Sequence, residues 1–140
     1  MSEEDNKAVV RRYFEEVWNK GDLAAADLLV APNFSLEGCG GAISGLEAVK
    51  LYVTSYRDVY PRVHFTILSL LAEGDMVVAC WLASSTNSAC DASPACKRGR
   101  KTGLSVYRIA SGQIAEAWAS TDHLGTGPMG RLGITRNPGS

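Results

Sequence analysis

The sequence predicts an α+β fold, with helices in the first half of the chain and a mainly antiparallel sheet in the second. Between residues 9 and 60, apolar residues recur at intervals of three and four, as they do on helices that bury one face. Between residues 63 and 122, the pattern changes to branched and aromatic runs that short turn signals separate. Because the helices precede the strands instead of alternating with them, the order favours α+β over α/β.

Two helices are expected near the N-terminus. The first has acidic residues at its start, which suit the helix dipole, and Gly21 as a natural cap at its end. Asp22 then caps a shorter helix, which stops near Pro32. The first helix carries one apolar stripe that would face the core, made of Val9, Val10, Tyr13, Phe14, Val17 and Trp18.

A third helix is expected between Ser44 and Pro61. Ser44 and Glu47 have the spacing of a capping box, in which each side chain bonds to the backbone N–H of the other residue. A short strand over residues 34–37 precedes this helix, and the glycines that follow the strand break it. The third helix carries Val49, Tyr52, Val53, Tyr56 and Tyr60 on one side.

The second half of the chain is expected to form two hairpins. The segment Glu73-Gly74-Asp75 has the composition of a tight turn, and Ser111-Gly112 forms a second turn. A polar loop separates the two hairpins. The four strands are expected at residues 63–72, 76–87, 101–110 and 113–122.

Helices on one face of a curling sheet leave a space that can become a pocket. We therefore expect a cone-shaped α+β barrel, in which three N-terminal helices pack on a curved, mainly antiparallel sheet. The chain of 140 residues suits one domain, which we place at residues 1–134, with a flexible tail over residues 135–140. The second face of the sheet still carries Val, Leu and Ile residues, which predicts a homodimer.

Composition and charge exclude several classes of function and partner. The formal net charge of -1 offers no basic excess to neutralise phosphates, so nucleic-acid binding is not expected. The short basic run over residues 97–101 is interpreted as a solvated loop and strand end. An acidic N-terminus and the lack of a long apolar stretch predict a cytoplasmic protein without a membrane partner. Neither a metal nor an organic cofactor is expected, because Cys90 and Cys96 lack zinc-ligand spacing and no phosphate-binding glycine motif is present.

The last strand carries the candidate chemistry. Because side chains alternate between the two faces of a strand, Glu116, Trp118 and Asp122 are expected to share one face, opposite a face of small residues. A carboxylate beside a tryptophan in a desolvated pocket has a raised pKa and can accept a proton near neutral pH. Asp122 is therefore a candidate base, and the alternative is a strand-end cap or a surface charge.

Three segments match the motifs of one known family. The segment from Gly112 to Trp118 is followed by Asp122 and then by Leu132-Gly133, as in the last motif of that family. The opening segment VVRRYFEEVWNKGDLAAADLLVAPNF matches the first two helices of the family, and AEGDMVVACW matches its central hairpin. In all three, the chain resembles the SnoaL-like polyketide cyclases of the ketosteroid-isomerase-like superfamily. The resemblance implies that Asp122 is the general base that deprotonates carbon for an intramolecular aldol closure.

The resemblance also suggests other site residues. Tyr13 matches a tyrosine in the first helix of ketosteroid isomerases, and Glu37 lies near their carboxylate base, with a solvated loop carboxylate as the alternative. Asn87 stands where the cyclases often have histidine, and it can donate a hydrogen bond but cannot exchange a proton. His123 could act as an acid or orient Asp122 if the chain bends there. The substrate-binding candidates, each of which could instead be plain core, are Tyr13, Tyr52, Tyr56, Trp81, Trp118 and His123.

These observations predict a cofactor-independent cyclase or isomerase that acts on a polyketide-like small molecule in secondary-metabolite or antibiotic biosynthesis. Two enzymatic alternatives are ring closure mainly by substrate folding, including cycloaddition, and epoxide opening by two cooperating acids. A third alternative is a non-catalytic small-molecule-binding module of the same fold. Paired acids predict that Asp122 faces Glu37 or Glu116, folding alone predicts an apolar cavity, and a binding module predicts no carboxylate inside.

Overall fold

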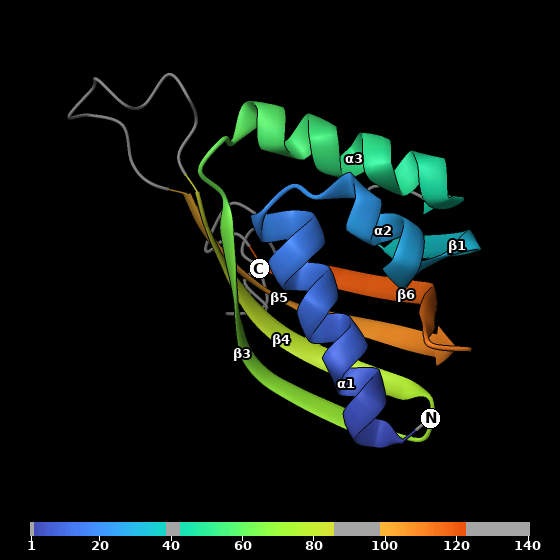
Figure 1. The fold of residues 1–140 in the computed structure, drawn as a ribbon. Helices are drawn as coiled ribbons and strands as arrows, with labels where there is room; N and C mark the ends of the chain where they lie inside the picture. The colour runs from blue at the N-terminus through green and yellow to red at the C-terminus, as the bar shows by residue number, and fades with distance from the viewer. Residues whose placement is uncertain (1, 39–42, 86–98, 123–140) are drawn as a thin grey trace, which may run out of the picture.

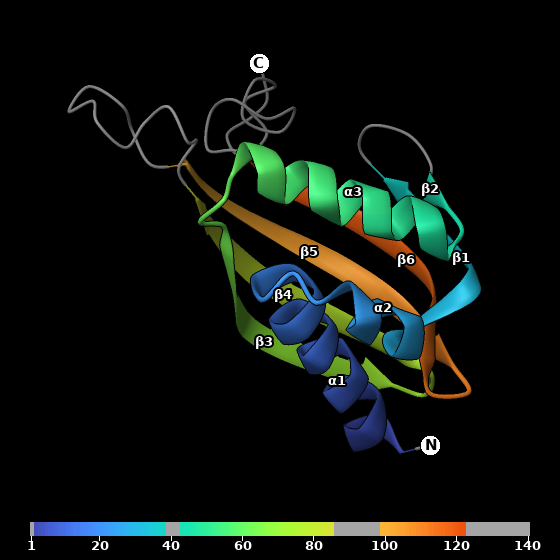
Figure 2. The same cartoon turned by 45° about the horizontal axis from the view of Figure 1, so that its top comes forward.

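The computed structural model describes residues 2–38, 43–85 and 99–122. Within these ranges, the helices lie on one face of a single curved sheet (Figure 1). Figure 2 shows the same arrangement from another side, with α1, α2 and α3 in front of the strands. The arrangement confirms the predicted α+β class, in which N-terminal helices pack on a curved and mainly antiparallel sheet.

The first helix begins as expected and then changes its winding. α1 spans Glu3–Arg12 with Ser2 as its N-cap, and η1 continues it over Tyr13–Asn19 as a π-helix. The N–H of Lys20 bonds to the carbonyl of Glu15, five residues earlier, which is the π-helical pattern. All residues of the predicted apolar stripe are buried, so the change of winding leaves the stripe on the core side.

The next two helices begin in different ways. α2 spans Leu23–Leu29, and the side chain of Asp22 caps it as expected. α3 spans Leu46–Val59, but its N-cap is Gly45, which makes no side-chain cap. The capping box predicted at Ser44 is therefore wrong, because Ser44 pairs with β1 as part of the short strand β2. Gly45 adopts a φ of 90°, a conformation that glycine reaches at little cost.

Six strands form one sheet in the order β2-β1-β6-β5-β4-β3. β1 and β6 run parallel, and the other neighbouring pairs of the described sheet run antiparallel. Gly74 forms the tight turn between β3 and β4 with a φ of 61°, where the first hairpin was expected. The strands span Val30–Gly38 (β1), Ile43–Ser44 (β2), His64–Glu73 (β3), Met76–Ser85 (β4), Gly99–Ala110 (β5) and Gln113–Asp122 (β6).

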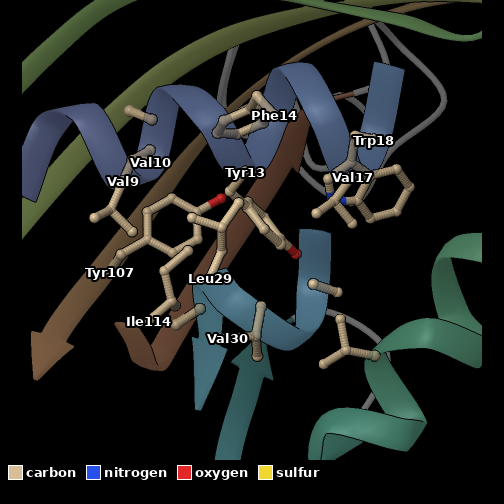
Figure 3. Close-up of a cluster of buried hydrophobic side chains, with 14 of the residues drawn as sticks. Val9, Val10, Tyr13, Phe14, Val17, Trp18, Leu29, Val30, Tyr107 and Ile114 are labelled. Atoms are coloured by element: carbon tan, nitrogen blue, oxygen red, sulfur yellow. The ribbon is translucent and has the colours of Figure 1, made fainter. Parts of the chain in front are cut away.

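The hydrophobic core fills the space between the helices and the inner face of the sheet. Figure 3 shows part of it, where Tyr13 lies between Tyr107 and Trp18. The largest fully buried side chains come from both layers and so hold the helices on the sheet; they are Val10, Val17, Val30, Val53, Val77 and Ile114. Full burial of a valine or isoleucine side chain stabilises the fold by roughly 1.5–3 kcal/mol relative to its exposed state.

Strand β6 contains one extra residue relative to β5. Ile109 pairs with Ile114, whereas the preceding residue, Arg108, pairs with Glu116. Ala115 is thus left over, as in a β-bulge. Because side chains alternate with a period of two, a single extra residue exchanges the two faces for the rest of the strand.

The exchange of faces overturns one expectation about the last strand. Ala117 is 3% exposed and faces the core, whereas Trp118 is 39% exposed on the opposite face. Glu116 lies next to it on that outer face, where its carboxylate bonds to the guanidinium of Arg108 at 3.0 Å. The prediction that the face with Trp118 is the pocket face is therefore wrong, because the bulge at Ala115 breaks the simple alternation.

Candidate functional site

A cavity of about 210 Å³ lies between the helices and the inner face of the sheet. Its walls come from η1, α3 and five of the strands, and most of the lining side chains are aromatic. A concave, mainly apolar space with a few polar groups is the usual form of a small-molecule site. The lining residues are Tyr13, Phe14, Trp18, Phe34, Leu36, Tyr52, Tyr56, Phe65, Trp81, Lys101, Ser105, Tyr107 and Ala117.

The aromatic wall is organised around Trp18. The rings of Tyr52 and Tyr56 meet Trp18 edge-on, with centroids 5.6 and 5.5 Å away. Phe65 lies 5.1 Å from Trp18 and 5.3 Å from Trp81, so the rings continue from the helix onto the sheet. Such pairs stabilise a structure by about 0.5–1.5 kcal/mol beyond burial. The wall is therefore well ordered and suits a flat, unsaturated ligand.

Ser105 provides a polar point on the floor of the cavity. The indole Nε1 of Trp81 donates a hydrogen bond to Ser105 Oγ at 2.9 Å, and both residues are buried. Burial raises the pKa of the neighbouring phenol of Tyr107 well above its ordinary value, and the proximity of the Ser105 hydroxyl acts in the opposite direction. Tyr107 therefore stays protonated at neutral pH.

Tyr13 places a second buried phenol beside Tyr107. The two ring centroids are 5.9 Å apart, and the rings meet edge-on (Figure 3). Burial raises the pKa of Tyr13 to about 12, although a hydrogen bond with Trp18 acts in the opposite direction. A phenol that keeps its proton can donate a hydrogen bond to a carbonyl oxygen, but it is not a base at neutral pH.

Lys101 brings a positive charge into the cavity wall. Its ammonium donates a hydrogen bond to the hydroxyl of Tyr56. The same nitrogen lies 4.6 Å from the centroid of the Tyr56 ring and 5.7 Å from that of Tyr60, within the range of cation–π attraction. Burial raises the pKa of Tyr56 to about 12, with Tyr60 as a smaller cause.

The described part of the lining offers hydrogen-bond donors rather than bases. It contains phenols, a hydroxyl, an indole N–H and an ammonium, but no carboxylate and no imidazole. Among the residues that the structure describes, no group of three or more His, Cys, Asp or Glu side chains could hold a metal ion. No helix in the described ranges is long and apolar enough to cross a membrane. The chemistry that these groups can support is the binding and polarisation of an oxygen atom.

Four of the predicted substrate-binding residues meet in this cavity. Tyr13, Tyr52, Tyr56 and Trp81 all line it, although they come from three separate elements. Trp118 does not belong to the lining and is partly exposed on the outer face of β6. The inner position of that strand is taken by Ala117, so a small residue leaves room for the cavity where the prediction had placed a large one.

The three predicted catalytic residues fall at the edge of the described structure. Asn87 lies outside the described residues, as does His123, and Glu37 and Asp122 are described only in their backbone. The backbone of Asp122 pairs with Thr102, and the alternation beyond the bulge assigns both positions to the outer face that carries Leu104 and Trp118. The register therefore does not support the expectation that Asp122 stands on a pocket face. The roles assigned to these side chains remain predictions.

Lys101 lines the cavity, although the basic run that includes it is typical of a solvated loop and strand end and did not indicate a site residue. A usable signal was present, because Lys101, Ser105 and Tyr107 stand at alternate positions of one strand and therefore share a face. A charged residue on the same face as a buried tyrosine indicates that the strand end lies at a pocket.

Comparison with known families decides the classification. The family described as the SnoaL-like domain matches residues 10–117, which include most of the described helices and strands. The chain belongs to the SnoaL-like family. This SnoaL-like chain matches no curated protein.

Solved structures of other proteins share the fold of this SnoaL-like chain. A candidate polyketide cyclase from Acidithiobacillus ferrooxidans is 27% identical, with 89% of this chain and 93% of that chain covered and a TM-score of 0.74. A candidate SnoaL-like polyketide cyclase from Jannaschia sp. CCS1 is 22% identical, with 87% and 88% covered and a TM-score of 0.76. IdmH, a candidate polyketide cyclase from Streptomyces antibioticus, is 21% identical, with 85% and 93% covered and a TM-score of 0.75.

Proposed function

We propose that this SnoaL-like protein is a cyclase or isomerase that acts on a polyketide-like small molecule and removes a proton from carbon. The observation that carries the proposal is the aromatic cavity between helices and sheet, with phenols and an ammonium in its wall. Family membership and a similar structure named as a candidate polyketide cyclase support the same class of reaction.

The cavity can hold a folded, unsaturated chain. Rings from η1, α3, β3 and β4 surround the space, and they would pack against a planar conjugated ligand. Holding a flexible chain in its reactive conformation can itself lower the barrier by several kcal/mol, because the entropy of orientation is lost on binding instead of in the transition state. Polar contacts with the phenols would fix the positions of the carbonyl groups.

The proposed reaction requires the chain to turn at the end of β6, so that the Asp122 side chain reaches the cavity from its outer-face position. There its carboxylate accepts a proton from a carbon next to a carbonyl group, which leaves an enolate. The enolate carbon attacks a second carbonyl carbon of the same chain, so that a C–C bond forms and the C=O π bond opens to an alkoxide. The alkoxide takes a proton from the protonated Asp122. Tyr13 and Asn87 are proposed to donate hydrogen bonds to the oxygens on which charge develops. The proton balance closes without a cofactor.

One observation favours a second candidate, ring closure mainly by substrate folding. The described lining of the cavity contains no carboxylate, and Glu116 forms its ion pair with Arg108 on the outer face. A cavity of this composition can orient a reactive chain and polarise its oxygens without a base of its own. In that case, Asp122 would not take part in proton transfer.

The proposal is tested with acetonaphthone, a flat aryl ketone whose methyl protons exchange slowly in water. The wild-type protein is incubated with this ketone in deuterated buffer, and loss of the methyl signal is followed by NMR. Naphthamide, a neutral molecule of similar shape, is added in a parallel series as a competitor. Binding of both molecules is measured separately through the fluorescence of Trp18 and Trp81, which line the cavity.

We expect the protein to accelerate deuterium exchange and naphthamide to suppress that acceleration. Suppression by a competitor shows that proton removal occurs in the cavity. Binding of both molecules without faster exchange would contradict the proposed carbon acid chemistry, and would favour ring closure by folding or a binding module. Failure of both molecules to bind would contradict the proposed use of the cavity itself.

A further inference from the structure

Lys101 and Tyr56 form a charged pair inside an otherwise aromatic wall, and the proposed mechanism leaves this pair without a role. Lys101 stands near the start of β5, and Tyr56 stands in α3, so the pair joins the sheet to the helical layer across the cavity. Both side chains line the space in which a ligand would lie. We propose that this pair is a subsite for an anionic oxygen carried by a flat, unsaturated ligand.

The geometry of the pair suits an oxygen anion. The Tyr56 hydroxyl accepts a hydrogen bond from the Lys101 ammonium, so the phenol can still donate its own hydrogen to a ligand oxygen. The nearby positive charge polarises that O–H group and strengthens the hydrogen bond that it donates. A ligand oxygen at this point would therefore meet a polarised phenol backed by a cation.

The surroundings increase the effect of the charge. The rings of Tyr56 and Tyr60 lie within 4.6 and 5.7 Å of the ammonium nitrogen, and Lys101 is half-buried. The other described lining residues are aromatic, aliphatic or hydroxyl-bearing. Charge–charge attraction is several times stronger at a partly desolvated site than in bulk water, because the effective dielectric constant is lower. The cavity should therefore prefer an anionic ligand to a neutral one of equal shape.

The position of the pair relates it to the proposed chemistry. Lys101 directly precedes Thr102, whose backbone pairs with that of Asp122, so the subsite and the proposed base belong to the same end of the β5–β6 ladder. The inference rests on the proposed function, since both concern the same cavity. The anionic oxygen could be a carboxylate that the substrate carries from the outset or the enolate oxygen that forms during proton removal.

The test compares naphthoate, which carries a carboxylate, with naphthamide, which has the same skeleton and no charge. Binding of both probes is measured for the wild type, Lys101→Met and Tyr56→Phe. The first variant keeps an unbranched apolar side chain, and the second removes only the hydroxyl. Lys20→Met and Tyr60→Phe are the controls, because neither residue lines the cavity and the second control keeps the ring beside Lys101. Acetonaphthone exchange is measured for the same set of proteins.

We expect Lys101→Met to weaken naphthoate binding by roughly 10- to 100-fold and to change naphthamide binding by less than about threefold. Tyr56→Phe should weaken naphthoate in the same direction, and both controls should bind like the wild type. A loss confined to naphthoate binding identifies a carboxylate site. A loss confined to acetonaphthone exchange identifies a site for the enolate oxygen.

Three results would overturn the inference. The first is equal weakening of both probes by Lys101→Met and Tyr56→Phe, which would show that the pair only supports the wall. The second is unchanged naphthoate binding together with unchanged exchange. The third is equal affinity of the wild-type protein for naphthamide and naphthoate, together with a rate of acetonaphthone exchange that does not depend on Lys101. This third result would leave the proposed function standing.

If neither probe binds the wild type, the inference and the proposed use of the cavity both fail. If Lys101→Met does not fold, Tyr56→Phe decides the question alone.

Discussion

The side-chain amide of Asn19 forms two hydrogen bonds with the backbone of Phe65. Its Nδ2 donates to the Phe65 carbonyl at 3.0 Å, and its Oδ1 accepts from the Phe65 N–H at 2.7 Å. The amide thereby ties the end of η1 to β3, in the manner of a neighbouring strand. Trp18 and Phe65, which both line the cavity, are held against each other by this contact.

Asn19→Ala should lower the free energy of unfolding by roughly 1–3 kcal/mol, because it leaves backbone groups of Phe65 without their partners. Asn33→Ala is the matched control at an exposed position, where a change within about 0.5 kcal/mol is expected. Urea denaturation of both variants measures the difference. Equal stabilities of the two variants would show that the Asn19 contact contributes little.

The pair of Trp81 and Ser105 gives a second stability prediction. Ser105→Ala should lower the free energy of unfolding by about 1–3 kcal/mol, because the buried indole N–H of Trp81 then loses its hydrogen-bond acceptor. In a background that already carries Trp81→Phe, the same substitution should cost much less, because no indole N–H remains to be satisfied. Thermal unfolding of the four proteins of this cycle tests the coupling. Equal costs in the two backgrounds would contradict it.

Alkaline pH should destabilise the protein through its buried phenols. Burial raises the pKa of Tyr13 from 10.0 to about 12, so between these values the unfolded chain loses the proton while the folded protein keeps it. The stability present below pH 10 is therefore lost as the pH rises toward 12, by roughly 3 kcal/mol from Tyr13 alone. Denaturation at a series of pH values measures this slope. Tyr13→Phe should reduce this slope; a slope equal to that of the wild type would refute the assignment.

The outer face of the sheet is proposed as the surface on which two copies of the chain meet. Leu104 and Trp118 are 50% and 39% exposed, and the register of β5 and β6 makes them diagonal neighbours. Adjacent exposed apolar side chains of this size favour self-association. Light scattering should give the mass of a dimer for the wild type and that of a monomer for Leu104→Glu. Leu28→Glu, on an exposed position of α2, is the control and should remain dimeric. A monomeric wild type would contradict the proposal.

The sequence predicted the elements better than it predicted the site. The stripe from Val9 to Trp18 and the turn at Gly74 depend on local patterns, and both predictions are confirmed. Ser44 does not cap α3, because pairing with β1 competes for the same residue. That competition depends on a tertiary contact, which a local motif does not include.

Two features of the site depended on details that a periodic pattern does not show. The extra residue Ala115 exchanges the faces of β6 and moves Trp118 away from the cavity, although the composition of the strand favoured the opposite orientation. Lys101 belongs to a basic run that resembles a solvated surface segment, and only its alternation with Ser105 and Tyr107 assigns it to the inner face. The sequence did predict Tyr13, Tyr52, Tyr56 and Trp81 as cavity residues. Their large rings face the core side of their elements, and that side lines both the core and the pocket.

Asp122→Asn tests most directly whether Asp122 removes a proton from carbon. The amide keeps the shape of the side chain and removes its basicity. With acetonaphthone as the probe, we expect the catalysed deuterium exchange to fall by roughly 10²–10⁴-fold, the usual contribution of a positioned general base. Naphthamide should bind as it does to the wild type, and the melting temperature should stay within a few degrees. Exchange at the wild-type rate in a folded variant that still binds naphthamide would contradict the claim and leave ring closure by substrate folding as the better account.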